Sequence, residues 1–187
     1  MHTINDSRKQ IQRLVSTLSF VVLIVLSQQV KADMLSWFKK TEIELSPMVS
    51  GTLTLNGKPV AGATVHRYLS YGDNKFHDSI KSDVDGRFTL PAHAAKIRVS
   101  AMFDTWISQE LIVEYADKKL EIWSTGATSV LKSDSITQLL SSMNCELSAP
   151  EMRLAIPWNN PQSPPLSVAS ICTFEQDQVI IEKALWK

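Results

Sequence analysis

The stretch of sequence that decides the fold is residues 49–68, VSGTLTLNGKPVAGATVHRY. Its beginning alternates apolar side chains with serine and threonine at period two, which is typical of a strand with one buried and one wet face. Asn56-Gly57 favours the positive φ of a tight turn, and Pro59 fixes the backbone that leaves this turn. The stretch therefore predicts a strand, a tight turn and a second strand.

The second strand of this stretch carries polar side chains opposite its small apolar ones. Ala63 and Val65 share one face, whereas His66 and Tyr68 lie on the other face and point toward solvent or a neighbouring element. Arg67 falls on the apolar phase of the strand. We therefore expect the strand to bulge or to leave the sheet near Arg67.

Short alternating segments continue along the chain after a polar loop over residues 71–77. The sequence DVDG at 83–86 is a turn signal, and Phe88 resumes the alternation until Pro91 ends it. Its two carboxylates fall short of the about six to eight oxygens that calcium prefers, so a turn is favoured over an ion site. Further strands are predicted at 97–103, 107–115 and 119–124. This pattern indicates an antiparallel sandwich rather than a parallel α/β sheet.

The pattern changes after Gly126. Ser133-Asp134 followed by SITQLLSSM predicts a short capped helix. Prolines in the segment 157–165 exclude regular structure there. SVASICTF at 167–174 and QVIIEKALW at 178–186 predict a closing hairpin. The chain is therefore expected to end in a small helix-plus-hairpin extension over residues 127–187.

The two cysteines of the chain, Cys145 and Cys172, permit a single intramolecular disulfide. Closing a loop of about 28 residues contributes about 3.6 kcal/mol by loop entropy. The bond would join the helix end to the hairpin and would staple the extension, not the sandwich. The alternative, a catalytic or metal-binding thiol pair, lacks a C-x-x-C spacing and a nearby histidine.

The N-terminal segment, residues 1–32, has the composition of a cleavable secretory signal. Basic residues precede LVSTLSFVVLIVL, an apolar core of 13 residues. A membrane span needs roughly 20. Small residues at 30–32 suit a signal peptidase, so we expect a periplasmic product without a stable membrane anchor. An uncleaved anchor is the alternative. Cleavage leaves 15 basic and 18 acidic residues, a net charge of −3 that gives no basic field for nucleic acid.

Two motifs resemble those of a known domain family. VSGTLTLNGKPVAGATV, followed after a variable loop by KSDVDGRFTLP, resembles the transthyretin-like or carboxypeptidase regulatory-like (prealbumin-like) domain. The motif positions are Gly51, Asn56, Gly57, Pro59, Gly62, Ala63, Asp85, Gly86 and Phe88. The resemblance implies an all-β, seven-stranded Greek-key (transthyretin/Ig-like) sandwich over residues 48–126, after a lead-in at 33–47, and it implies no activity. The flanking segments FKKTEIELSP, NCELS and SICTF resemble a group of small exported bacterial proteins.

These motif positions have scaffold roles. Gly57 allows the positive φ of the turn, Gly86 closes the aspartate-rich turn, and Phe88 fills the core. Gly62 and Ala63 are expected to permit close approach between the sheets.

Two enzyme groups share the architecture that the resemblance implies. Hydroxyisourate hydrolases end in a Tyr-Arg-Gly-Ser tetrapeptide that builds their active site, whereas this chain ends in Ala-Leu-Trp-Lys. Intradiol dioxygenases hold non-haem iron with two tyrosines and two histidines. The residues that could supply such a set are His66, Tyr68, Tyr71, His77 and His93, but a His-x-His pair is missing from the sequence. Surface histidines are therefore favoured, and we expect no catalytic, cofactor-binding or metal-binding residues.

The sequence thus favours an exported, non-enzymatic β-sandwich that contacts a protein or a glycan in the cell envelope. Trp158, in the proline-rich segment, is the candidate partner contact because exposed aromatic residues are enriched in interfaces. One alternative is an immunity- or inhibitor-type protein that binds a periplasmic hydrolase. Another is a metal-dependent enzyme on the same scaffold.

Overall fold

The computed structural model describes residues 40–98, 105–127, 134–157, 164–174 and 180–182. The chain divides into two compact units, residues 1–41 and 42–187, and the sheets below belong to the second. Within the described residues, no helix has the length and apolar character that crossing a membrane requires. The expected signal peptide at 1–32 and the expected partner contact Trp158 lie outside the described residues.

The larger sheet has seven strands in the order β14-β11-β12-β9-β8-β4-β5, and all neighbouring pairs are antiparallel. Its strands are β4 (Thr64–Tyr71), β5 (Asn74–Lys81), β8 (Ile107–Tyr115), β9 (Lys118–Ala127), β11 (Met152–Ile156), β12 (Leu166–Ser170) and β14 (Ile180–Glu182). Strands β4 and β5 form one hairpin, and β8 and β9 form another. The sheet therefore combines two local hairpins with strands from the C-terminal part of the chain.

The smaller sheet has five strands in the order β13-β10-β2-β3, with β6 also paired to β2. Its strands are β2 (Val49–Leu55), β3 (Lys58–Pro59), β6 (Arg87–Leu90), β10 (Met143–Glu146) and β13 (Cys172–Thr173). Strand β10 runs parallel to β2 and follows the helix α3 (Asp134–Leu140). A two-stranded sheet pairs β1 (Thr41–Ser46) with β7 (His93–Ile97).

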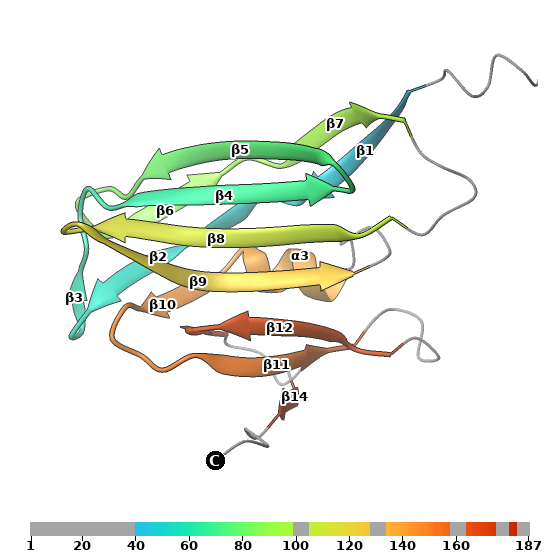
Figure 1. Cartoon of the computed structure of the whole chain (residues 1–187). Helices are drawn as coiled ribbons and strands as arrows, with labels where there is room; N and C mark the ends of the chain where they lie inside the picture. The colour runs from blue at the N-terminus through green and yellow to red at the C-terminus, as the bar shows by residue number, and fades with distance from the viewer. Residues whose placement is uncertain (1–39, 99–104, 128–133, 158–163, 175–179, 183–187) are drawn as a thin grey trace, which may run out of the picture. The chain divides into compact units, whose positions relative to one another are not determined.

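Apolar side chains from the seven-stranded and the five-stranded sheet meet in one core. Leu53 and Phe88 come from the smaller sheet, and Val65, Leu111 and Trp123 come from the larger one. Figure 1 shows the larger sheet in front of the smaller one, with α3 behind β9. The predicted all-β sandwich is therefore confirmed.

One local prediction in the first half of the chain was wrong. The segment 71–77, expected as a polar loop, forms the end of β4, the turn and the first half of β5, because Gly72 takes a φ of 55° and reverses the chain immediately. Strand β7 ends at Ile97, where the strand expected at 97–103 would begin. Residues 99–104 lie outside the described part of the chain.

The C-terminal residues complete both sheets instead of forming a separate appendage. Strand β12 pairs with β9 and β11, and β14 pairs with β11, so the described residues of 167–174 and 178–186 do not pair as the expected hairpin. The sulfur atoms of Cys145 and Cys172 lie 2.00 Å apart, the distance of a disulfide. Because β10 pairs with both β2 and β13, this bond staples the sandwich itself. The short helix was predicted correctly.

The expected bulge at Arg67 was also wrong. Strand β4 keeps a regular register with both neighbours, and the Arg67 side chain is fully buried. Its guanidinium is satisfied by the carboxylate of Asp78 on β5 and by Ser46 Oγ, which accepts from Nη1 at 3.0 Å. The irregular pairing of this sheet lies between β8 and β9, at Leu111 and Ile112. A strand can therefore carry a buried charge and still pair regularly when neighbouring side chains supply the hydrogen bonds and the opposite charge.

The turn residues explain how the quoted stretch reverses direction. Asn56 and Gly57 have φ angles of 52° and 74°, which the Asn-Gly pair tolerates. Gly62, expected at a close approach between sheets, is instead required for its own φ of 73°, since a Cβ there would meet nothing within 4 Å. Its neighbour Ala63 is fully buried.

Candidate functional site

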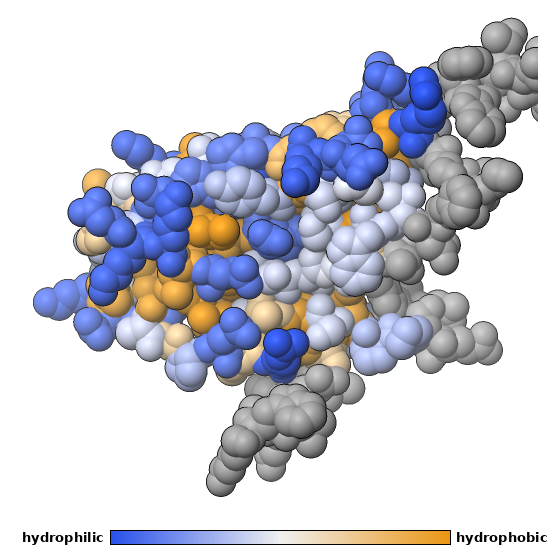
Figure 2. Space-filling model, in the orientation of Figure 1, coloured by the Kyte–Doolittle hydropathy of each residue, from blue (hydrophilic) through white to orange (hydrophobic). Residues whose placement is uncertain are grey.

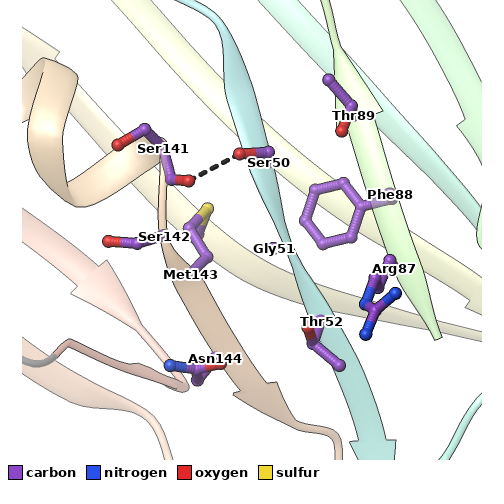
Figure 3. A pocket seen from close by; sticks show the side chains of 10 residues that line it. All are labelled: Ser50, Gly51, Thr52, Arg87, Phe88, Thr89, Ser141, Ser142, Met143 and Asn144. Carbon is purple, nitrogen blue, oxygen red and sulfur yellow. Dashed lines mark hydrogen bonds between the residues drawn. The ribbon is translucent and has the colours of Figure 1, made fainter. Parts of the chain in front are cut away.

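A polar groove on the outer face of the smaller sheet is the candidate functional site. It has a volume of about 340 Å³ and lies where β2, β6 and β10 meet the end of α3 (Figure 3). Its polar lining consists of Ser50, Thr52, Arg87, Thr89, Ser141, Ser142 and Asn144. We refer to this site as the groove.

Strand alternation places these polar side chains outside. Strand β2 turns Leu53 into the core, so Ser50 and Thr52 lie on the opposite face. Strand β6 does the same, because its buried Phe88 follows the exposed Arg87. The sequence pattern that forms the core therefore also forms the polar face.

Four adjacent strands align Arg87, Thr52, Asn144 and Thr173 in one row across the sheet. Thr52 pairs with Arg87 on β6 and with Asn144 on β10. Asn144 in turn pairs with Thr173 on β13. Strands lie about 4.8 Å apart, so the row extends over about 14 Å. The row presents a guanidinium, two hydroxyls and an amide.

The junction of β2 and β10 forms one side of the groove. Ser50 Oγ donates to the carbonyl oxygen of Ser141 at 2.6 Å, which ties the end of α3 to β2 (Figure 3). A Cβ at Gly51 would lie 2.4 Å from the carbonyl oxygen of Met143. Only glycine allows β10 to approach β2 so closely.

Glu146, at the end of β10, fixes the turn that follows β2. Its carboxylate accepts hydrogen bonds from the backbone N–H groups of Asn56 at 2.8 Å and Gly57 at 3.0 Å. It also accepts from the hydroxyl and the backbone N–H of Ser148. The hydrogen bond from the Ser148 hydroxyl, with that from the Gly57 backbone, lowers the pKa of Glu146 to about 2. The carboxylate is therefore ionised at neutral pH and holds the Asn-Gly turn to β10.

The chemistry of the groove is that of hydrogen bonding. Of the residues that line it, Arg87 alone carries a charge, and its Nη1 lies 3.3 Å from Oδ2 of the exposed Asp85. The other polar groups of the groove are neutral hydroxyls and an amide, which donate and accept hydrogen bonds without changing protonation. The lining contains no histidine, cysteine or carboxylate to serve as general acid or base. The groove suits binding of a hydroxylated ligand.

The five residues considered as iron ligands do not all converge, because Tyr71 and His93 lie apart from the other three. Strand β4 turns His66 and Tyr68 to the outer face of the larger sheet, where the rings stack with His77 of β5. Tyr71 is buried on the opposite face, and His93 belongs to β7 of the two-stranded sheet. Across the described part of the chain, no group of three histidine, cysteine, aspartate or glutamate residues is placed to hold a metal ion.

A second pocket, of about 410 Å³, has a mostly apolar lining that includes Leu55, Tyr115, Leu120 and Leu147. It lies beside the turn from β8 to β9. Figure 2 shows the outer face of the larger sheet, largely polar or intermediate in colour, with an apolar area toward that same end. The two pockets therefore suit different groups, and only the groove suits a hydroxylated ligand.

Sequence reasoning identifies only part of the groove. The hydroxyl alternation of β2 marks Ser50 and Thr52 as outward-facing. Asn144 joins them because β10 inserts between β2 and β13, and no periodicity in the sequence predicts that long-range pairing. Arg87 carries no signal either, because the aspartate-rich turn before it explains its exposure equally well.

Comparison with known proteins gives one match. No curated protein and no solved structure matches this chain. The model of a family described as a domain of unknown function (DUF6795) matches residues 49–150, which is more than half of the chain. The matched span runs from the first residue of β2 past the end of β10, and so contains every strand that lines the groove. The chain belongs to the DUF6795 family.

Proposed function

We propose that this protein is an exported, non-enzymatic β-sandwich that binds a glycan of the cell envelope in the groove. The row Arg87–Thr52–Asn144–Thr173 carries the proposal. Glycans present closely spaced hydroxyls along their length, and this row offers matching donors and acceptors at the spacing of adjacent strands. A linear glycan that lay across the strands would meet one polar side chain at each strand.

The openness of the site to solvent agrees with this class of ligand. Arg87, Asn144 and Thr173 are exposed, and Thr52 is half-buried. Water can bridge such groups to a ligand with little loss of enthalpy compared with direct hydrogen bonds. The side chains of Ser50 and Thr52 are held on a paired strand, so little conformational entropy is lost when the ligand binds.

Two features of the sequence support the envelope as the location. Residues 1–32 have the composition of a secretory signal, and the cysteine pair requires an oxidising compartment to persist. The motif resemblance to transthyretin-like domains agrees with a binding module on a sandwich scaffold. We therefore propose a periplasmic location for the mature chain.

Binding to isolated envelope glycans tests the proposal. The mature chain, residues 33–187, is incubated with purified peptidoglycan and with lipopolysaccharide, and the bound fraction is measured after sedimentation. We expect the wild-type chain to bind one of the two. Thr52→Val and Asn144→Leu, which keep side-chain size while removing hydrogen-bonding groups, should each weaken binding about tenfold.

Ser79→Ala, on the outer face of the other sheet, serves as the matched control and should bind as the wild type does. A wild-type chain that sediments with neither glycan contradicts the proposed ligand. Equal binding by wild type and Thr52→Val contradicts the groove as the site. N-terminal sequencing of the chain recovered from the periplasm should begin near Asp33, and recovery from the cytoplasm alone contradicts export.

A further inference from the structure

We propose that His66 and His77 form a binding site for a divalent transition metal ion of the copper or nickel class. The two histidines occupy adjacent strands, β4 and β5, on the outer face of the larger sheet. The Nδ1 atom of His66 lies 3.0 Å from the Nε2 atom of His77. This site is separate from the groove and does not depend on the proposed function.

The separation of the two nitrogen atoms suits one shared ion. Imidazole nitrogen binds such ions at about 2.0–2.1 Å. Two nitrogens at these distances and 3.0 Å apart subtend about 94° at the ion. That angle fits square-planar or octahedral coordination, which copper(II) and nickel(II) prefer, better than the tetrahedral coordination of zinc.

Glu114 on β8 lies beside the second ring nitrogen of His66, Nε2. Its Oε2 lies 3.5 Å from Nε2 of His66, an atom that is buried and makes no hydrogen bond. A carboxylate there favours the tautomer with the proton on Nε2, which leaves Nδ1 free to bind the ion. Lys119 on β9 lies 3.4 Å from the same carboxylate oxygen. The arrangement has the form of a carboxylate–histidine–metal relay.

The second histidine is oriented by its neighbour. The Tyr68 and His77 rings stack with centroids 4.5 Å apart and an interplanar angle of 24°. The planes of the two histidine rings differ by 17°. Without the ion, the two facing nitrogens share one proton as an N–H···N hydrogen bond. When the ion binds, that proton moves to Nδ1 of His77, so two neutral rings bind with no net release of protons.

The site supplies two protein ligands, and water completes the coordination. Because the described residues hold no third histidine, cysteine, aspartate or glutamate in ligating position, the ion would exchange with solvent. This separates the site from the four-ligand iron centre considered from the sequence. Exchange of an ion with solvent suits capture or delivery of the metal more than a permanent structural role.

Titration of the mature chain with copper(II) alone tests the proposal, by isothermal calorimetry and by electron paramagnetic resonance. We expect one ion per chain and hyperfine splitting from two imidazole nitrogens. His77→Phe keeps an aromatic ring on Tyr68 and removes the ligating atom, so the two-nitrogen signature should be lost while the circular dichroism spectrum is unchanged. Glu114→Gln should weaken binding about tenfold or more.

His93→Phe is the matched control, since it removes a histidine that lies outside this pair, and copper binding should be unchanged. Magnesium(II), which avoids imidazole, should not bind at this site. Equal copper affinity and an equal spectrum for wild type and His77→Phe would overturn the proposal. A wild-type spectrum with one nitrogen ligand would overturn it as well.

Discussion

The guanidinium of Arg67 holds both carboxylate oxygens of Asp78 on the neighbouring strand, Oδ1 through Nε and Oδ2 through Nη2. Arg67 is fully buried, whereas 31 % of the Asp78 side chain is exposed. Burial of Asp78 acts to raise its pKa, but the hydrogen bonds and charge of Arg67, together with His93, outweigh burial and lower it. Because Asp78 pairs with Arg67, strand β4 carries a buried guanidinium and keeps a regular register with its neighbours.

Arg67→Met should reduce the free energy of unfolding by about 3 kcal/mol, because Asp78 is left partly buried without its cation. Urea denaturation followed by circular dichroism measures the change. Arg153→Met, at an exposed position of β11, should change it by no more than about 0.5 kcal/mol. In a double-mutant cycle, Arg67→Met with Asp78→Asn should cost less than the sum of the two. Strict additivity would mean that the pair does not interact.

Glu146→Gln should destabilise the protein at pH 7 by weakening the hydrogen bonds that fix the Asn56-Gly57 turn. The folded pKa is lowered to about 2 from a usual value of 4.5, so the stabilisation is complete above pH 4.5 and is lost as the pH falls toward 2. Urea denaturation of wild type and variant across this range should show their difference shrinking to zero. A difference that stays constant from pH 7 to pH 2 would contradict the role of the ionised carboxylate, and Glu42→Gln, exposed on β1, is the control.

Replacing both cysteines by alanine should lower the free energy of unfolding by about 3–4 kcal/mol, from the loop entropy that the bond removes. The sequence separation of the two cysteines is 27 residues. The double variant avoids an unpaired thiol, and its unfolding midpoint in urea is compared with that of the oxidised wild type. Alkylation of the wild type in denaturant without reductant should label no cysteine. Two labels per chain would show that the bond is not formed.

Gly51→Ala should destabilise the protein by about 1–3 kcal/mol, because the added methyl group pushes β10 away from β2. Nuclear Overhauser contacts between residue 51 and Met143 should weaken. Gly57→Ala separates steric from conformational cost, since nothing lies within 4 Å of a Cβ there and only its φ of 74° is strained. It should cost about 1–2 kcal/mol and leave the β2–β10 contacts intact. Unchanged stability in Gly51→Ala would contradict the tight junction.

The local features of the fold are predictable from the sequence. Alternation in β2 and the Asn56-Gly57 pair predict a strand and its turn, and the cap at Ser133-Asp134 predicts the helix. These signals depend on neighbours in sequence, so one strand or one turn suffices to show them. The all-β class follows from the same local evidence.

The predictions that failed concern features that depend on partners far along the chain. Arg67 looks incompatible with a core strand because its partners, Asp78 and Ser46, lie on other strands. Residues 74–77 of the polar segment become part of β5 because β4 provides a hydrogen-bonding edge beside them. The groove shows the same limit, since Asn144 faces Thr52 only after β10 has docked. Periodicity reports which face is apolar but not which strand lies next to it.

The parallel pairing of β2 with β10 has a consequence for how the molecule is made. The residue at 51 finds its neighbour at 143 only after the intervening chain has been synthesised, and contacts of such separation slow folding into the millisecond-to-second range. Until then β2 offers an open edge to any other extended chain, which is a route to aggregation. Truncation before residue 143 would remove β10 and leave that edge permanently open.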